Sequence, residues 1–315
     1  MKIHHNITEL VGKTPLVELH NYSKAHQLNA RIIAKLEYLN PAGSIKDRAA
    51  LNMIEAAEKT GQLKKGQTIV DITSGNTGIA IAAIAAAKGY RTKFYVSDNI
   101  SADKIKLLKL YGGEVVAVEN AFFMDPEALE KMAARIKAEN PDAFFIDQLA
   151  NPNNPAVHIV STGPEIWADT DGKIDILVCA MGTGGTVSGT GKFLKEKNPA
   201  IKVVIAEPAE SSLPSEENPY PDEIDGVHKV SEVPSESLPK NYNAAVVDEI
   251  VALDTKDARK TAKELLISEG IFPGVSGGAI LWTATRLAER NENKGKMIVA
   301  IFPDGGERYL SATTV

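Results

Sequence analysis

The run ILVCAMGTGGT, residues 176–186, places an apolar β-rich segment directly before a glycine-rich turn that opens a helical segment. Glycines let the main chain approach an anion closely, and the unpaired N–H groups of a helix start add a positive end. We therefore predict a strand, a helix over 186–197, and between them a phosphate-binding turn formed by Gly182, Thr183, Gly184, Gly185 and Thr186.

The same alternation of short β-rich runs and longer segments of helical period extends over the whole chain. The predicted strands are 31–36, 68–71, 92–96, 114–118, 143–146, 174–179, 203–207, 250–253 and 297–302. The predicted helices are 45–60, 77–88, 102–110, 125–137, 186–197, 256–269 and 277–290. This order indicates an α/β fold with a largely parallel sheet. A loop-like stretch at 150–155 suggests a domain boundary near 145–155, and 208–242, with six prolines, suggests a long surface or lid segment.

Composition limits the classes of function. The 315 residues are enough for two domains, and 43% hydrophobic with 24% charged residues is typical of a globular protein. A net charge of −6 gives no reason to expect nucleic acid or an anionic membrane as partner. The longest apolar run, 79–87, is too short to span a bilayer, and no secretory signal is visible, so we expect a cytoplasmic protein. Cys179 is the only cysteine, which excludes an intrachain disulfide and a cysteine-rich metal site, and no metal is expected.

A dinucleotide-binding turn is the alternative for the glycine-rich run. Gly182 and Gly184 match the first two glycines of Gly-x-Gly-x-x-Gly, but Val187 stands at the third position. Glu207 follows at about the distance of the acid that binds a ribose. A nicotinamide-dependent enzyme therefore stays open at this point, as does a tight turn without a ligand.

Two further polar loops follow predicted strands, at the end of the sheet where open α/β proteins bind ligands. TSGNTG, residues 73–78, offers hydroxyl and main-chain donors to a carboxylate at a helix start, although the same residues cap helices without any ligand. NPAGSIKDR, residues 40–48, places Lys46 in the first turn of a helix. Most lysines are simply solvated, but the helix dipole and partial burial would lower the pKa of this one and favour Schiff-base chemistry.

Together these loops resemble the pyridoxal-phosphate enzymes of the cysteine synthase and cystathionine β-synthase family. The resemblance covers almost the whole chain and includes LVGKTPL at 10–16, NPNNP at 151–155, His158, TGPE at 162–165 and ERYLS at 307–311. It implies two open, mostly parallel sheets flanked by helices, the fold of the tryptophan synthase β subunit. It also implies a smaller substrate-binding domain, 46–148, and a larger cofactor-binding domain, 1–45 with 149–315.

The resemblance assigns site residues by position. Lys46 would bind pyridoxal 5'-phosphate covalently and move the Cα proton, and Asn76 would contact the ring hydroxyl. The phosphate would lie on Gly182, Thr183, Gly184, Gly185 and Thr186, and the substrate carboxylate on Thr73, Ser74, Thr77 and Gln148. The reaction implied is β-replacement on an O- or S-substituted alanine through an aminoacrylate, with cysteine synthesis from O-acetyl-L-serine and sulfide as the leading case.

The chain departs from the family pattern at several places. The helix start SADK, residues 101–104, is expected to border the cleft, and Gly277 replaces a frequent second serine. Two further departures concern the expected site. In PDGG, residues 303–306, glycine replaces the serine that the resemblance places on the pyridine nitrogen. Asp304 turning inward or water would fill the gap, whereas Asp304 would face outward if it is only a turn residue. The second place is HKVSEVPSES, residues 228–237, where glycines give way to Glu232 and Glu236. These acids would orient the nucleophile if they face the substrate, or face solvent as acids in polar loops usually do.

Alternatives to cysteine synthesis remain at this stage. One is a β-lyase or β-synthase that acts on cysteine or serine and releases hydrogen sulfide or water. Another is a catalytically silent regulatory homologue, which the altered 303–306 run leaves open. The resemblance further implies a homodimer with small-molecule amino-acid substrates.

Overall fold

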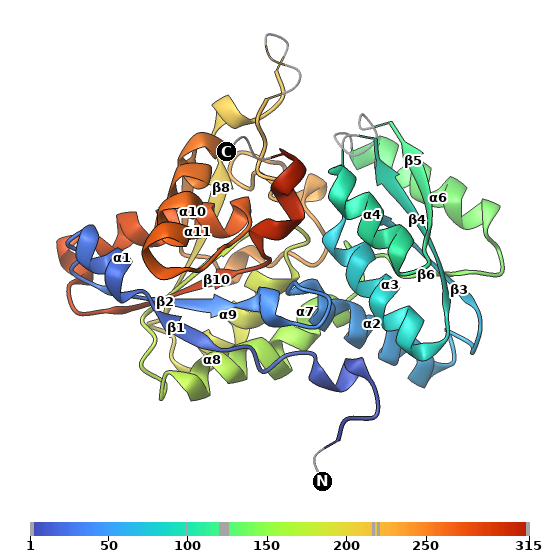
Figure 1. Ribbon diagram of the computed structural model, residues 1–315, viewed down its shortest axis with the longest axis horizontal. Helices are drawn as coiled ribbons and strands as arrows, with labels where there is room; N and C mark the ends of the chain where they lie inside the picture. The colour runs from blue at the N-terminus through green and yellow to red at the C-terminus, as the bar shows by residue number, and fades with distance from the viewer. Residues whose placement is uncertain (1–2, 99, 120–125, 216–217, 219–220, 313–315) are drawn as a thin grey trace.

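The computed structural model describes residues 3–98, 100–119, 126–215, 218 and 221–312. Its strands form two open sheets, and each is the centre of one lobe (Figure 1). The large lobe has a six-stranded sheet, and only its edge strand β1 is antiparallel to its neighbour. The strand order is β1 (Leu16–Glu18), β2 (Arg31–Leu36), β10 (Met297–Phe302), β7 (Ile176–Ala180), β8 (Lys202–Pro208) and β9 (Glu249–Leu253).

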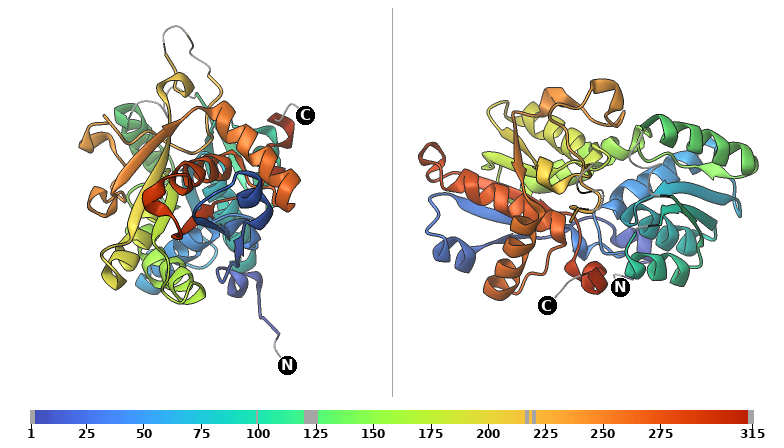
Figure 2. Two further views of the ribbon diagram at one scale, coloured as in Figure 1. Left: turned by 90° about the vertical axis from the view of Figure 1, so that its left-hand side faces the viewer. Right: turned by 90° about the horizontal axis from the view of Figure 1, so that it is seen from above.

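The small lobe has a four-stranded, all-parallel sheet. Its order is β5 (Glu114–Val118), β4 (Arg91–Ser97), β3 (Thr68–Thr73) and β6 (Phe144–Phe145). Seen from above, the two lobes lie side by side and the C-terminal turn lies between them (Figure 2). The predicted α/β class with two open, mostly parallel sheets is confirmed.

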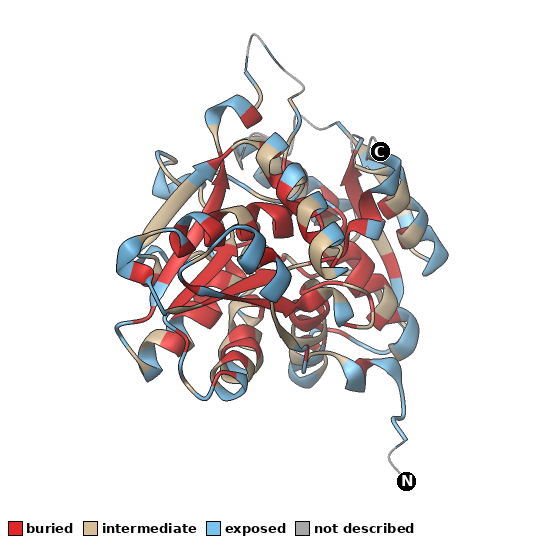
Figure 3. Ribbon diagram, turned by 60° about the vertical axis from the view of Figure 1, so that its left-hand side comes forward, coloured by how far each residue is buried: buried red, intermediate tan, exposed pale blue. Residues whose placement is uncertain are grey.

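Helices cover both faces of each sheet and bury its apolar residues (Figure 3). In the small lobe, α2 (Lys46–Thr60), α3 (Asn76–Lys88) and α4 (Ala102–Leu110) share one core, and α6 (Pro126–Glu139) covers the other face. In the large lobe, α10 (Thr255–Glu269) and α11 (Val275–Ala288) cover one face, while α8 (Gly163–Asp169) and α9 (Gly185–Lys197) cover the other. Among the described residues no helix has the length and apolarity that a membrane crossing needs.

The predicted strands and helices lie close to their expected bounds, but four short strands and α-helices, α8 among them, were not predicted. Strand β1 and helix α1 (His20–Ala25) were not predicted, and each is too short for its periodicity to stand out. The predicted loop at 150–155 is wrong at its end, because helix α7 (Asn153–Val157) begins there and continues through a π-helical turn, His158–Thr162, into α8. Pro155 is tolerated because it lies in the first turn of α7, where its missing N–H costs no helical hydrogen bond. Asp125, the first residue of the predicted 125–137 helix, lies outside the described residues.

Loops that follow parallel strands carry the polar motifs. The loops after β3, β7 and β10 and the segment after β2 all leave the carboxyl ends of their strands. Ser44 forms an antiparallel bridge with Asp304, so the segment before Lys46 lies against the loop after β10. The described part of 208–242 contains only short 3-10 turns, as the composition suggested. The carboxyl ends of the strands therefore define one site between the lobes.

Candidate functional site

Lys46 begins helix α2 at the junction of the two lobes. The Ile45 amide donates to the carbonyl of Pro303 over 2.8 Å, which fixes this helix start to the large lobe. Burial lowers the pKa of Lys46; Asp304 partly opposes this effect, and the Lys104 ammonium adds to it. The Lys46 amine is thus shifted toward its neutral, nucleophilic form, as its first-turn position had suggested.

A buried charge cluster of Lys35, Glu37, Arg48 and Glu165 holds the first turn of α2 in place. Arg48 donates to both oxygens of Glu37 over 2.8 and 2.9 Å and to both oxygens of Glu165 over 2.7 Å. Lys35 donates to Glu165 over 2.8 Å and to the carbonyl of Thr14 over 2.6 Å. The motifs at 10–16 and 162–165 therefore meet two residues away from Lys46, and their function is to position its helix.

The glycine-rich loop after β7 presents unused main-chain donors. Within the described chain, the amides of Gly182, Thr183 and Gly184 form no hydrogen bond. Gly184 has a left-handed backbone with φ of 79°, which a side chain would strain. A Cβ on Gly185 would lie 2.1 Å from Asn154 Oδ1, so no side chain fits there either. Three free amides at the start of a 13-residue helix are donors of the kind that bind a phosphate.

Glu207 does not play the part that a dinucleotide site requires. Its carboxylate is buried and accepts hydrogen bonds from the amides of Val230 and Ser231, over 2.8 and 2.9 Å, and from the Ser231 hydroxyl. These bonds fix the segment after residue 229 to the end of β8. Both oxygens of Glu207 are thus engaged inside the chain and the residue is buried, which weakens the main support for the nicotinamide alternative.

The loop after β3 and the start of α3 form the second part of the site. Thr73 Oγ1 accepts hydrogen bonds from the amides of Gly75 and Gly78, each over 3.1 Å, and so caps α3. The Ser74 hydroxyl is exposed and has no partner in the described residues. Thr77 donates to Gln148 Oε1, which joins two of the predicted carboxylate ligands. All four predicted residues thus lie at one helix start.

Asp304 is turned inward, and only 1% of its surface is exposed, so its alternative role as an outward-facing turn residue is wrong. Its Oδ2 accepts from Asn76 Nδ2 over 2.6 Å and from the Tyr309 hydroxyl over 2.5 Å. Arg308 donates to the side-chain oxygen of Asn76, Oδ1, over 2.9 Å. Asp304 Oδ1 is buried without a hydrogen-bond partner, and a Cβ on Gly274 would meet it at 2.1 Å. This orphan oxygen therefore lies beside the start of α11.

Residues 224–228, which we call the strap, contact both lobes. The His228 amide donates to the carbonyl of Met181 over 2.7 Å, and the carbonyl of Gly226 packs on Gly182. Asp225 forms an ion pair with Lys104 of α4, whose ammonium also lies 4.6 Å from the ring centre of Tyr309. The strap thus joins the glycine loop to the small lobe.

The structure does not bring Glu232 and Glu236 into this group. Glu232 has φ of 62°, a left-handed backbone that favours glycine, and its carboxylate accepts from Lys229 over 2.8 Å with 82% of the side chain exposed. Glu236 is exposed and its partner is the neighbouring Ser235. Both acids face solvent in this arrangement.

Several site residues had no role assigned from the sequence. They are Asp225, Arg308 and Ser276, while Lys104 was expected only to border the cleft as part of the helix start 101–104. Ser276 is buried in the first turn of α11, and its hydroxyl has no hydrogen-bond partner in the described chain. The signal was a Gly-x-Ser sequence at a helix start, two residues from the glycine that adjoins Asp304.

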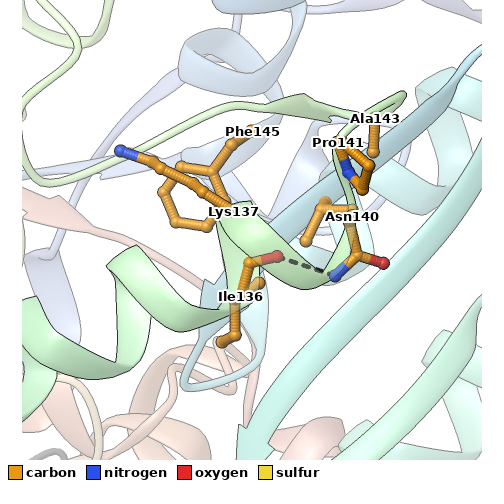
Figure 4. A pocket seen from close by; sticks show the side chains of 7 residues that line it. Ile136, Lys137, Asn140, Pro141, Ala143 and Phe145 are labelled. Atoms are coloured by element: carbon orange, nitrogen blue, oxygen red, sulfur yellow. Dashed lines mark hydrogen bonds between the residues drawn. The ribbon is translucent and has the colours of Figure 1, made fainter.

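A pocket in the small lobe lies away from the predicted site residues. A shallow pocket at the edge of the small lobe is lined by Lys137, Asn140 and Phe145, with the Lys137 ammonium 4.5 Å from the ring centre of Phe145 (Figure 4). None of the predicted site residues lines it. The described residues contain no group of three or more His, Cys, Asp or Glu side chains placed to bind a metal.

The site residues fit pyridoxal phosphate. A buried lysine of lowered pKa could react with the cofactor aldehyde, and three free amides could donate hydrogen bonds to its phosphate. The unpartnered oxygen of Asp304 and the free hydroxyl of Ser276 are available to a ring nitrogen. The site therefore has a group for each end of this cofactor.

Comparison with known proteins agrees with this chemistry. The model of the pyridoxal-phosphate-dependent enzyme family matches residues 7–304. Cysteine synthase B of Escherichia coli (strain K12) is 40% identical over 305 residues, 97% of this chain and 94% of that protein. Two solved structures are similar: a cysteine synthase from Entamoeba histolytica (41% identity, TM-score 0.84, 98% and 90% coverage) and a hydrogen sulfide-producing enzyme from Fusobacterium nucleatum (38%, 0.88, 98% and 100%). The chain therefore belongs to the family of pyridoxal-phosphate-dependent enzymes.

Proposed function

We propose that the protein catalyses β-replacement on an O-substituted L-serine, and that its reaction is the synthesis of L-cysteine and acetate from O-acetyl-L-serine and sulfide. The observation that carries the proposal is the meeting of three groups between the lobes. They are the Lys46 amine, the free amides of 182–184 and the hydroxyl-rich helix start at 73–78. Relatives at 40% identity that are named cysteine synthase support the specific reaction.

Each group has a defined task in this proposal. Bound pyridoxal phosphate supplies an electron sink for negative charge that develops at the substrate Cα. Lys46 Nζ would hold the cofactor and, once released, would accept the Cα proton and return it, because burial lowers its pKa and so favours the neutral amine. The amides of 182–184 and the Thr186 hydroxyl bind the phosphate. Ser74 and Thr73 donate to the substrate carboxylate, and the Asn76 amide faces the ring hydroxyl.

The partner of the ring nitrogen is proposed to be Asp304, through its orphan Oδ1. A buried carboxylate there favours a protonated ring and a stronger electron sink. Ser276 offers a neutral hydroxyl in the same region. Asp304→Ser and Ser276→Ala separate the two: removal of the true partner shifts the absorbance of the bound cofactor, whereas the other substitution leaves the spectrum unchanged.

A β-lyase that releases sulfide from L-cysteine is the second candidate, and the Fusobacterium nucleatum enzyme of 38% identity supports it. The two reactions are separated by product analysis. Cysteine synthesis predicts rapid acetate release from O-acetyl-L-serine in the presence of sulfide and little sulfide release from L-cysteine alone. The reverse ratio of rates would support the lyase. If neither O-acetyl-L-serine nor L-cysteine is consumed, both functions are rejected.

The family resemblance also supports two further proposals. The first is that the protein works as a homodimer in the cytoplasm, which sedimentation analysis and cell fractionation test. The second is that 46–148 behaves as the smaller domain and 1–45 with 149–315 as the larger. Limited proteolysis that releases a stable fragment of about 46–148 would agree with this division. Cleavage within both sheets at equal rates would contradict it.

A further inference from the structure

Asp71 is a buried acid with no task in the proposed chemistry. It lies on β3 opposite Phe94 of β4, and only 1% of its surface is exposed. A carboxyl group inside an apolar sheet costs folding free energy unless it is neutral or well paired. Asp71 lies two residues before Thr73, where β3 leads into the loop 73–78 that is proposed to bind the substrate carboxylate.

The side chain of Asp71 contacts Gln148. Gln148 Nε2 donates to Asp71 Oδ2 over 3.1 Å and to the carbonyl of Ile72 over 2.9 Å, and Oε1 accepts from the Thr77 hydroxyl. The orientation of the amide is fixed, because the Ile72 carbonyl can only accept. The main chain is fixed as well, since the carbonyl of Gln148 accepts from Asn154 and Asn241 over 2.9 and 2.8 Å.

The side-chain donors of Gln148 are all in use. A glutamine amide has two N–H groups, and both already have acceptors. The Thr77 hydroxyl hydrogen is used as well. Gln148 therefore cannot donate to a substrate carboxylate until one of its two bonds is released. The bond to the Ile72 carbonyl is the shorter and belongs to the main chain, so the bond to Asp71 is the exchangeable one.

We infer that Asp71 is the resting hydrogen-bond acceptor of Gln148, and that an α-carboxylate of the substrate displaces it. The inference rests on the proposed function, because it gives Gln148 a carboxylate to bind. It makes Asp71 a specificity-determining residue that acts through Gln148. A ligand gains this hydrogen bond only if it is a better acceptor than Asp71.

The charge around Asp71 agrees with this role. Burial raises the pKa of Asp71 well above its ordinary value, and the nearby Asp147 carboxylate raises it further. Asp147 is itself 3.7 Å from the Lys137 ammonium at the surface. Hydrogen bonds from Ile72 and Gln148 oppose this shift in part. The net direction favours the neutral carboxyl, which accepts more weakly than the ionised carboxylate of a substrate.

The test compares Asp71→Leu with Asp71→Asn, two substitutions of nearly the same shape. Asparagine keeps an acceptor for Gln148, and leucine removes it. Calorimetry measures the dissociation constant of L-serine for each holoenzyme, with ethanolamine as the ligand that lacks a carboxylate. We expect Asp71→Leu to bind L-serine about threefold to tenfold more tightly than the native protein, because no resting bond is broken. Asp71→Asn should stay within about twofold, and ethanolamine should not distinguish the variants.

Gln148 provides the control. In a Gln148→Ala background, Asp71→Leu should no longer change the affinity for L-serine, and additive effects would overturn the inference. Weaker or unchanged binding of L-serine by Asp71→Leu would also overturn it. Asp71→Ala replaces the leucine variant if that variant does not fold. Failure of the proposed function is seen separately, because the assay of acetate release from O-acetyl-L-serine and sulfide tests it on the native holoenzyme without any substitution at Asp71 or Gln148.

Discussion

Arg48→Met removes the guanidinium at the centre of the buried charge cluster. The methionine keeps the length and packing of the side chain but none of its donors. Glu37, with no exposed surface, would keep only the Thr14 hydroxyl and the Asn40 amide as partners. Glu165 would keep Lys35 and the main-chain amide of Lys13.

The expected cost follows from burial. Removing one partner of a buried ion pair leaves an uncompensated charge and destabilises a protein by about 3–5 kcal/mol. Arg290 provides a matched control, because it also donates to both oxygens of a glutamate, Glu249, over 2.9 and 2.6 Å. That pair is 34% and 29% exposed, so Arg290→Met should cost at most about 1 kcal/mol.

Urea unfolding of both holoenzymes measures the difference, followed by circular dichroism and by intrinsic fluorescence. The two signals must coincide for a single free energy of unfolding to apply to a chain with two lobes. Costs that agree within about 1 kcal/mol for Arg48→Met and Arg290→Met would refute the reasoning, because burial would then make no difference.

Three further predictions test other parts of the site. Gly185→Ala should lower cofactor affinity at least about tenfold in an absorbance titration, because its Cβ would meet Asn154 Oδ1; native affinity would contradict this. Lys104→Met should speed amide hydrogen exchange over 224–228, since the strap loses its ion pair with the small lobe; unchanged exchange would show that other contacts hold it. Burial would raise the pKa of Glu165, but hydrogen bonds from Arg48 lower it to about 2. Glu165 therefore stabilises the fold above pH 4.5 and loses this effect as pH falls toward 2. The stability gap between the native protein and Glu165→Gln should close over that range, and a constant gap would be inconsistent.

Most of the fold follows from local pattern, because apolar β-rich runs and helical periods determine strands and helices. Strand β1 and helix α1 could not be predicted, since three and six residues are too few to show a period. Helix α7 was hidden by asparagine and proline residues, which mark loops in general but also suit a first helical turn.

The loops of the site were predictable because glycine, hydroxyl and lysine residues followed strands at the expected places. The inward direction of the Asp304 side chain could not be predicted, because it depends on hydrogen bonds from Asn76 and Tyr309. Asn76 is distant in sequence, and nothing in the local sequence shows that Tyr309 would turn toward Asp304. Asp71 was overlooked for the same reason. Its meaning comes from contact with Gln148, a residue 77 positions away.

The central claim is that the Lys46 amine binds the pyridoxal-phosphate aldehyde. Reduction of the purified holoenzyme with borohydride, followed by proteolysis and mass spectrometry, tests it most directly. We expect one modified lysine, in the peptide that contains Lys46, and loss of the modification in Lys46→Ala. A protein that carries no cofactor, or that carries it on a different lysine, would contradict the account.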